Sequence, residues 1–314
     1  MERRASSLLF MGMVLIVAWL AGAHDASSED AGGTRHVVSL PMYEVSPVLK
    51  RADDVFWSRL QVRFREEGIE APVALDRGEA DLVAHWKARN LLLSQTCGFP
   101  YLHVLHDEGV RIVGTPVYAA NDDLPAGEYR SVLVVRANAP YKTIADLRGQ
   151  RAGVNEWNSN SGMNAFRAAV ARAFTPEELK KGIFASVRLT GGHLKSVRMI
   201  VEGSIDVSAI DSVSYALIVR EYPTLGKRTR ILAVTPTAPG LPLITSATTS
   251  EETIGKMRRI IRETILHPGG DAELRHALKT MALKDFVVIS EKEYLARIDA
   301  LEELARDKGY PELK

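Results

Sequence analysis

Only one cysteine, Cys97, occurs in the 314 residues of this sequence. A chain with a single cysteine cannot form an internal disulfide, so a hydrophobic core must hold the fold together. The apolar residues make up 46% of the sequence, which is sufficient for such a core. Internal repeats and low-complexity tracts are also absent, so the sequence indicates neither a repeat architecture nor a biased tail.

A surplus of charge of either sign is missing as well. The 40 Lys and Arg residues are balanced by 39 Asp and Glu residues, which leaves a net charge of +1. Proteins that bind nucleic acids usually carry a basic patch and a basic composition. The composition therefore gives no support for a nucleic-acid partner.

Long apolar runs are confined to the N-terminus. The run at 8–20 is shorter than the about 20 residues that a membrane span needs. Two arginines precede it, and the small residues Ala21-Gly22-Ala23 follow it. This pattern predicts a cleavable signal peptide at 1–23, with cleavage near Ala23, and an uncleaved anchor is the alternative. We therefore expect an exported, periplasmic chain that does not span the membrane after cleavage, with a disordered lead-in at 24–35.

Strand and helix signals alternate along the rest of the chain. This alternation predicts an α/β fold with mostly parallel sheets. We expect strands at 36–40, 81–86, 111–118, 131–136, 151–155, 185–189, 205–210 and 230–235. We expect the main helices at 46–67, 162–174, 194–202 and 213–221. The length suggests two lobes, 36–131 plus 236–314 and 132–235, with the chain crossing between them near 129–133 and 232–236.

The first turn with chemical content is Ser159-Asn160-Ser161-Gly162. It follows a predicted strand that ends at Asn155 and precedes a predicted helix. A helix N-terminus has free N–H groups and a partial positive charge, and glycine allows a ligand to approach the backbone. The turn can therefore bind a tetrahedral oxyanion, although ordinary capping by Ser161 is an equal alternative.

Two further features accompany this turn. Thr190-Gly-Gly-His193-Leu-Lys-Ser196 also follows a predicted strand and opens a helix, so His193 and Ser196 could donate to an anion. Asp211 ends the predicted strand that starts near Asp206. Ligands of open α/β sheets bind outside the carboxyl ends of the strands, where Asn155, His193 and Asp211 would meet. A carboxylate there fits a ligand that carries a proton or an ammonium group to donate. A protonated phosphate or phosphite would satisfy Asp211, whereas fully ionised sulfate would be repelled.

This ordered set of turns resembles the phosphate-, phosphite- and phosphonate-binding family of ABC-transporter receptors. The features that carry the resemblance are S-x-S-G at 159–162, G-x-H at 191–193 with Ser196, and D-V-x-A-x-D at 206–211. It extends to Tyr129-Arg-Ser131 and to Gln95-Thr-Cys-Gly-Phe-Pro-Tyr101, and it covers roughly 36–245. The resemblance implies a two-lobed periplasmic-binding fold of type 2, with a hinge between the lobes.

The resemblance also implies roles for individual residues. Ser159, Asn160, Ser161 and Gly162 would hold phosphonyl oxygens, His193 would donate to another oxygen, and Asp211 would accept from the ligand. Tyr43 would wall the cleft from the first lobe, and the weaker candidates are Tyr118, Gln95 and Ser131. The expected partners are a small oxyanion and an ABC permease, the chain is expected to be a monomer, and neither a cofactor nor a metal is expected.

Two other functional classes stay open at this point. A thiol enzyme would use Cys97 as nucleophile with His103, His106 or His193 as base, but Cys97 has no evident activating feature. His103 and His106 alone are also too few for a metal site. A binding protein that serves a sensor instead of a permease is the second alternative, although no signalling domain is fused to the chain.

Overall fold

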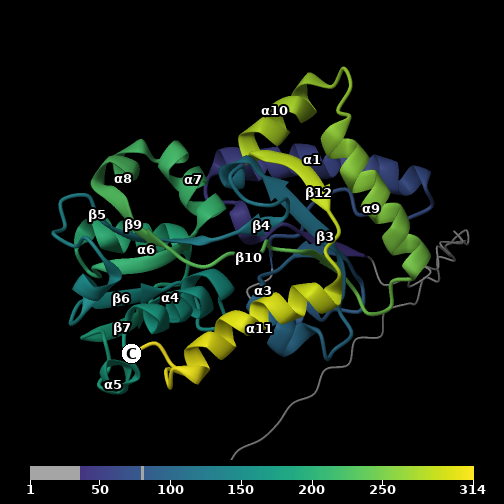
Figure 1. The fold of residues 1–314 in the computed structure, drawn as a ribbon. Helices are drawn as coiled ribbons and strands as arrows, with labels where there is room; N and C mark the ends of the chain where they lie inside the picture. Colours follow the sequence, from purple (N-terminus) through teal and green to yellow (C-terminus); the bar gives the residue numbers. More distant parts are fainter. Residues whose placement is uncertain (1–35, 79–80) are drawn as a thin grey trace, which may run out of the picture. The chain divides into compact units, whose positions relative to one another are not determined.

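The computed structural model describes residues 36–78 and 81–314, so the predicted signal peptide and lead-in lie outside the described residues. Two five-stranded sheets form its framework (Figure 1). In spatial order the first sheet contains β1 (Val37–Ser39), β2 (Leu91–Gln95), β11 (Leu243–Thr245), β3 (Arg111–Tyr118) and β12 (Leu283–Val287). The second sheet contains β7 (Ser186–Leu189), β6 (Arg151–Val154), β8 (Val207–Asp211), β5 (Ser131–Arg136) and β9 (Thr229–Val234).

Helices surround both sheets. The α-helices are α1 (Pro47–Glu66), α2 (Leu82–Trp86), α3 (Gly98–Pro100), α4 (Ala165–Ala173), α5 (Pro176–Lys180), α6 (His193–Glu202), α7 (Ser212–Glu221), α8 (Pro223–Arg228), α9 (Glu251–Leu266), α10 (Ala272–Met281) and α11 (Glu291–Asp307). Short 3-10 and π turns are η1 (Pro41–Tyr43), η2 (Tyr101–Leu105), η3 (Ala119–Asn121), η4 (Ile144–Leu147) and η5 (Asn160–Asn164). None of the helices among the described residues has both the length and the apolar character of a membrane span.

The α/β class predicted from the alternation is confirmed, but the prediction of mostly parallel sheets is wrong. In the first sheet only β1 and β2 pair in parallel, while β11 is antiparallel to both β2 and β3. In the second sheet β6 is parallel to β7 and β8, and β5 is antiparallel to β8 and β9. The cause is topological, because the chain returns from the second sheet and inserts β11 between strands that were laid down earlier.

The strand predicted at 81–86 is also wrong, because this segment forms helix α2. Oδ1 of Asp81 accepts hydrogen bonds from the N–H groups of Val83 and Ala84, at 3.0 and 3.1 Å. These bonds satisfy N–H groups that the first turn of a helix leaves without partners, and so favour the helix. The strand that pairs with β1 is β2, which follows α2 directly and is buried throughout.

The central strands of the second sheet are buried on both faces. Along β5, Leu133 and Val135 pack in one apolar cluster with Phe166 of α4. The alternate residues Val132 and Val134 pack in another cluster, which includes residues of α6 and α7. Side chains alternate between the two faces of a strand, so an unbroken apolar run fits a strand that is covered on both sides.

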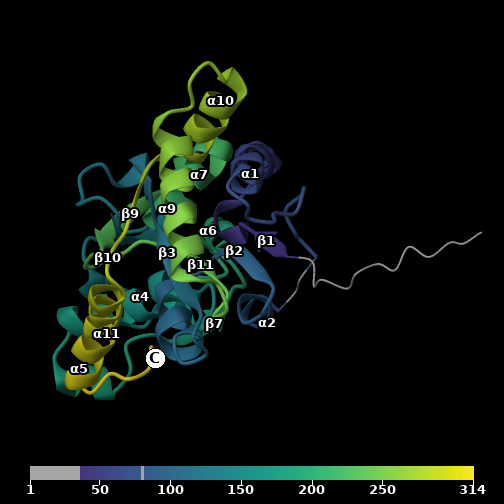
Figure 2. The same cartoon turned by 90° about the vertical axis from the view of Figure 1, so that its right-hand side faces the viewer.

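Helices α1, α9 and α10 pack together beside the first sheet (Figure 2). Trp57 and Phe64 of α1 are buried in the large core cluster there, with their rings edge to face and 5.9 Å apart. A helix is stabilised mainly by the burial of its apolar side, and α1 begins with Ser46 as N-cap and Pro47 at its first position.

Two segments that connect the sheets run side by side. β4 (Glu128–Tyr129) pairs antiparallel with β10 (Ala238–Pro239). Beside this pair, the N–H of Thr235 donates to the carbonyl of Ser131 at 2.9 Å. The segments lie between the two sheets in Figure 1.

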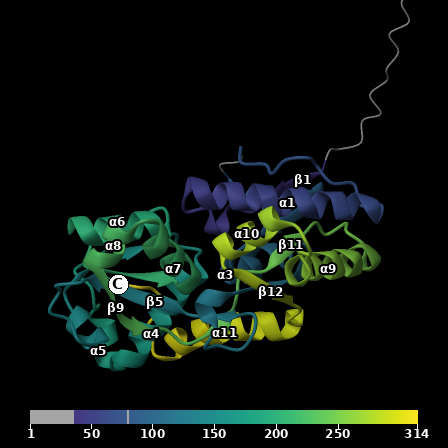
Figure 3. The same cartoon turned by 90° about the horizontal axis from the view of Figure 1, so that it is seen from above.

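The C-terminal helix α11 makes a third connection. It contacts α4 of the second sheet, as Figures 1 and 3 show, and Tyr310 and Leu313 lie in the same cluster as Phe166. The apolar side of the last helix covers residues of α4 that the second sheet alone leaves open, a contact that no local pattern reveals.

Candidate functional site

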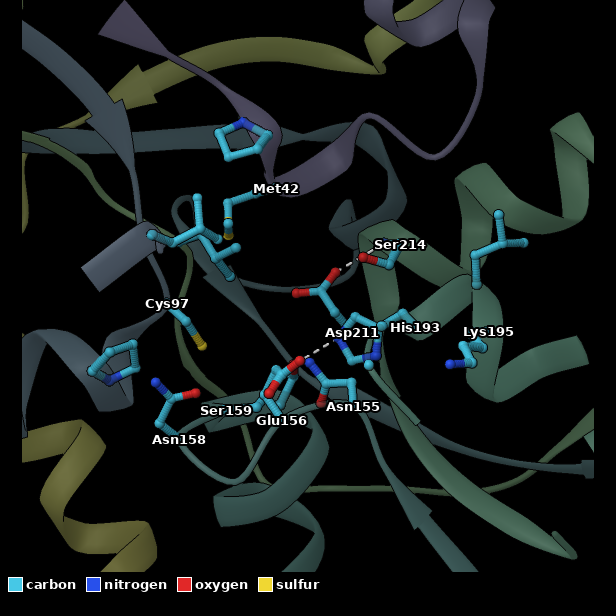
Figure 4. Close-up of a pocket in the computed structure, with 18 of the residues that line it drawn as sticks. Met42, Cys97, Asn155, Glu156, Asn158, Ser159, His193, Lys195, Asp211 and Ser214 are labelled. Carbon is cyan, nitrogen blue, oxygen red and sulfur yellow. Dashed lines mark hydrogen bonds between the residues drawn. The ribbon is translucent and has the colours of Figure 1, made fainter. Parts of the chain in front are cut away.

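A cleft of about 930 Å³ lies between the two sheets. The carboxyl ends of the parallel strands β6, β7 and β8 open into it. Figure 4 shows side chains from the three turns that follow these strands, among them Asn155, Ser159, His193 and Asp211, around a common space. The structure thus brings the three sequence motifs together at one sheet edge, as the strand-end argument predicted.

The turn at the start of η5 is held by its serines. Oγ of Ser159 accepts the N–H of Gly162 at 3.0 Å, so Ser159 rather than Ser161 caps the helix. Oγ of Ser161 lies 3.3 Å from Oγ of Ser159 and 3.0 Å from Nε2 of His193. From β5, Ser131 Oγ donates to the carbonyl of Ser161 at 3.0 Å. The hydroxyl of Ser131 therefore supports the turn from behind.

Position 162 requires glycine because the side chain of Asn155 lies very close to its backbone. A Cβ atom on this residue would lie 1.7 Å from Oδ1 of Asn155. That oxygen is buried and forms no hydrogen bond with any residue that the structure describes. Any larger residue at 162 would displace the Asn155 side chain from the wall of the cleft.

The second turn requires two glycines. Gly191 and Gly192 have φ values of +78° and +148°, which residues with a Cβ rarely adopt. They position His193 as the first residue of α6. Burial lowers the pKa of His193 to about 4, so its ring is neutral at neutral pH. Its Nδ1 is buried without a partner among the described residues, while Nε2 faces Ser161.

Asp211 is the last residue of β8 and also lines the cleft. Its Oδ1 accepts the N–H of Ser214 at 2.9 Å, and its Oδ2 accepts the hydroxyl of Tyr43 at 3.3 Å. Burial raises the pKa of Asp211 to about 6, although the bonds from Ser214 and Tyr43 act in the opposite direction. The carboxyl group can therefore gain or share a proton near neutral pH.

Asn160 is occupied inside the protein. Its Nδ2 donates to the hydroxyl of Tyr129 at 2.8 Å, and its Oδ1 accepts from Asn164 at 3.0 Å. Its N–H points to Sγ of Cys97 at 3.1 Å. Asn160 is fully buried and does not line the cleft, so it holds the turn in place and has no donor directed at the cleft.

Ser196 and the weaker candidates Gln95 and Tyr118 also do not line the cleft. Ser196 is buried, with its Oγ 2.6 Å from Oγ1 of Thr190. Gln95 donates to the carbonyl of Leu241 at 3.1 Å and lines a small cavity with Tyr118 and Tyr43. The rings of Tyr43 and Tyr118 meet edge to face at 4.9 Å in this small cavity. Tyr43 does not line the cleft itself, but its hydroxyl donates to Asp211, which does.

The sequence interpretation missed the opposite wall of the cleft. Met42, Leu82, Trp86 and Leu241 line it from the side of the first sheet. The only local signal for this wall was that Met42 directly precedes Tyr43, which the sequence had already assigned to the cleft. On the side of the second sheet, the missed residues are Glu156, Asn158, Lys195 and Arg198.

Cys97 lines the cleft, but the net effect of its surroundings disfavours the thiolate. Burial raises the pKa of Cys97, which lowers the population of the reactive thiolate. His103 lies 2.7 Å from Glu302 and His106 lies 3.2 Å from Asp107, while His193 faces Ser161. Among the described residues no histidine forms a hydrogen bond with Cys97, so the geometry of a thiol nucleophile with its base is not formed.

Solved structures of substrate-binding proteins share this fold. PhnD1 from Prochlorococcus marinus, in complex with methylphosphonate, has a TM-score of 0.68 at 14% identity, over 88% of this chain and 99% of that chain. A binding protein component of an ABC phosphonate transporter from Pseudomonas aeruginosa has a TM-score of 0.66 at 16% identity, over 88% of each chain. XAC2383 from Xanthomonas citri, bound to ATP, has a TM-score of 0.60 at 14% identity, over 88% of this chain and 98% of that chain. These likenesses confirm the predicted periplasmic-binding fold of type 2.

No curated protein matches the chain by sequence. The family described as "ABC transporter, phosphonate, periplasmic substrate-binding protein" matches residues 66–294. That range is most of the chain, and it includes all three turns at the edge of the second sheet. The chain therefore belongs to the family of periplasmic substrate-binding proteins of phosphonate ABC transporters.

Proposed function

We propose that this protein captures a small phosphorus oxyanion in the cleft and delivers it to the permease of an ABC transporter. The observation that carries this proposal is the convergence of Ser161, His193 and Asp211 at the carboxyl ends of adjacent strands. Candidate ligands are phosphate, phosphite and phosphonates.

Membership in the family establishes the general role of the protein. Members are the substrate-binding components of transporters, so the chain is a binding protein and not an enzyme. The family is periplasmic, and its members work with a small ligand and a permease. We further propose that the chain is exported by the signal at 1–23, is cleaved near Ala23, and acts as a monomer. The signal pattern at the N-terminus supports the export and the cleavage.

The η5 turn and the start of α6 supply the attraction for an anion. The first N–H groups of a helix have no partners within the helix and carry a partial positive charge. Ser159 and Ser161 place hydroxyl groups at the first of these helix starts, and His193 begins the second. The N–H groups of Asn160 and Gly162 already donate to Cys97 and Ser159. A dianion would therefore be held mainly by the hydroxyl groups and by the partial positive charge of the helix starts.

Asp211 gives the site its chemical selectivity in this proposal. A buried carboxylate repels a fully ionised anion, but it accepts a hydrogen bond from a ligand that still has a P–OH group. The raised pKa of Asp211, about 6, is near the second pKa of phosphate groups, so one proton can be shared between them. PhnD1, which has the same fold, holds methylphosphonate, and this supports a phosphorus ligand.

We assign the remaining residues by their contacts. Gly162 and Asn155 shape the wall, while Ser131 and Asn160 hold the turn from behind. Tyr43 would close the site from the first sheet. The two sheets would be the centres of the lobes 36–131 plus 236–314 and 132–235, and β4 and β10 would be parts of the hinge. Ligand binding is then expected to close the lobes by hinge motion.

Titration calorimetry of the purified protein tests the proposal, with phosphate, phosphite and methylphosphonate as ligands and sulfate as the control anion. Because a ligand that binds only the folded state stabilises it by mass action, a thermal-shift screen gives an independent readout. We expect at least one phosphorus oxyanion to bind with a Kd in the micromolar range or below, and sulfate to bind more weakly. Failure of all the phosphorus oxyanions to bind at millimolar concentration would overturn the proposal.

A further inference from the structure

The two walls of the cleft differ in chemistry. The wall from the second sheet is polar and includes Asn155, Ser159, Ser161, His193 and Asp211. The wall from the first sheet is largely apolar and includes Pro41, Met42, Leu82, Val83, Trp86 and Leu241. An oxyanion on the polar wall therefore has an apolar surface opposite it.

The acidic side chains of the cleft are mostly engaged. Glu44 pairs with Arg77, whose Nε donates to Oε1 at 2.7 Å. Asp81 caps α2 through its Oδ1. Asp211 accepts from both Tyr43 and Ser214. Glu156 is exposed and belongs to the polar wall, so the carboxylates beside the apolar wall are Glu44 and Asp81, and both already have hydrogen-bond partners.

The cleft is also wide in this arrangement of the two sheets, at about 930 Å³, so it admits a ligand larger than an inorganic anion. In the same arrangement, an inorganic anion or a one-carbon phosphonate on the polar wall would leave the apolar wall in water. A substituent of several carbons would remove that apolar surface from water, which favours binding in proportion to the area buried.

We propose that the ligand is an organophosphonate with an apolar substituent of several carbons, whose oxyanion lies on the polar wall and whose substituent packs against Met42, Leu82 and Trp86. This inference rests on the proposed function, and it adds the class of substituent that the protein selects. Ligands with an ammonium group at the end of the substituent are disfavoured, because the charge would lose water against Met42, Leu82 and Trp86, which offer it no acceptor.

A ligand series tests the inference by calorimetry on the wild-type protein. The series is phosphite, methylphosphonate, butylphosphonate, phenylphosphonate and 2-aminoethylphosphonate. We expect affinity to rise about fourfold for each buried methylene, and therefore by more than tenfold from methylphosphonate to butylphosphonate. Equal affinities along the series, or tightest binding of 2-aminoethylphosphonate, would overturn the inference and leave the proposed function standing. Absence of binding by every member would overturn both.

A matched pair of variants tests whether the substituent packs against the apolar wall. In Met42→Gln the ratio of butylphosphonate to methylphosphonate affinity should fall at least threefold, because a polar side chain replaces part of the apolar wall. Val48 is an exposed apolar residue at the start of α1 that does not line the cleft, so Val48→Gln should keep the wild-type ratio. The ratio within one variant is independent of any general loss of folded protein. An unchanged ratio in Met42→Gln would overturn the assignment of this wall.

Discussion

The hydroxyl of Tyr43 donates to Oδ2 of Asp211 at 3.3 Å, and this bond links the turn after β1 to the end of β8. Both side chains are buried, with 7% and 1% of their surface exposed. Tyr43 thus supplies one of the few polar contacts of a carboxyl group that has lost its water. The raised pKa of Asp211 shows that these contacts do not fully replace that water.

This relationship predicts how stability depends on pH. The folded state binds the proton of Asp211 more tightly than the unfolded state, in which the pKa is near 3.8. The contribution to stability is therefore full below about pH 4 and is lost as the pH rises through 6. The wild type should therefore lose up to ~3 kcal/mol of unfolding free energy from this group between pH 4 and pH 7.5. Asp211→Asn lacks the titrating group, so its unfolding free energy should fall less over the same range. Urea denaturation at several pH values measures the difference, and parallel curves for the two proteins would contradict the prediction.

Asp211→Asn should also change anion selectivity. The amide cannot repel a fully ionised anion and can donate a hydrogen bond to it, so sulfate should compete better with the phosphorus ligand. We expect the sulfate inhibition constant to fall at least tenfold relative to the wild type at pH 7.5, as measured by displacement calorimetry. Sulfate competition no stronger in the variant than in the wild type would count against the role given to Asp211.

Two buried serines provide a matched test of the site. Ser161 lies on the cleft beside His193, whereas Ser196 is equally buried but contacts Thr190 away from the cleft. Ser161→Ala should weaken oxyanion binding about tenfold, the loss expected for one hydrogen bond to a charged group. Ser196→Ala should leave the affinity within about twofold. Equal effects of the two variants in calorimetry would mean that Ser161 acts only through the packing of the fold.

The larger substitution Ser161→Leu should abolish binding, because its side chain would occupy the space in front of the helix N-terminus. Calorimetry with the same oxyanions checks this, and circular dichroism controls for folding. Wild-type affinity in this variant would show that the η5 turn does not bind the oxyanion.

A buried arginine of α4 is expected to hold the segment that follows α11. Arg167 is 5% exposed, and its guanidinium donates to Asn164 Oδ1 at 2.9 Å and to the carbonyl of Pro311. Arg167→Ala would leave these buried acceptors without donors, so the free energy of unfolding should fall by ~2–4 kcal/mol. The control is Arg148→Ala, which removes an exposed pair with Glu178 at 2.7 Å and should cost much less. Urea denaturation of both variants measures the effect, and similar losses would contradict the prediction.

Local patterns in the sequence determined the parts of this protein that depend on short-range geometry. The run Val132 to Val135 predicted a strand buried on both faces, because side chains alternate along a strand. Gly191 and Gly192 marked a turn that needs positive φ values. Strand ends followed by polar turns also predicted that Asn155, His193 and Asp211 would meet, since the carboxyl ends of parallel strands share one edge.

The tertiary structure decided the parts that depend on partners far along the chain. Asn160 was expected to face a ligand, but Cys97 and Tyr129 engage its donors, and only the fold brings them near. The antiparallel direction of β11 followed from the return of the chain from the second sheet, and the apolar wall was assembled from η1, α2 and the segment before β11. Local periodicity reflects the repeat of a strand or a helix, whereas hydrogen-bond partners and cleft walls depend on packing between segments that are distant in sequence.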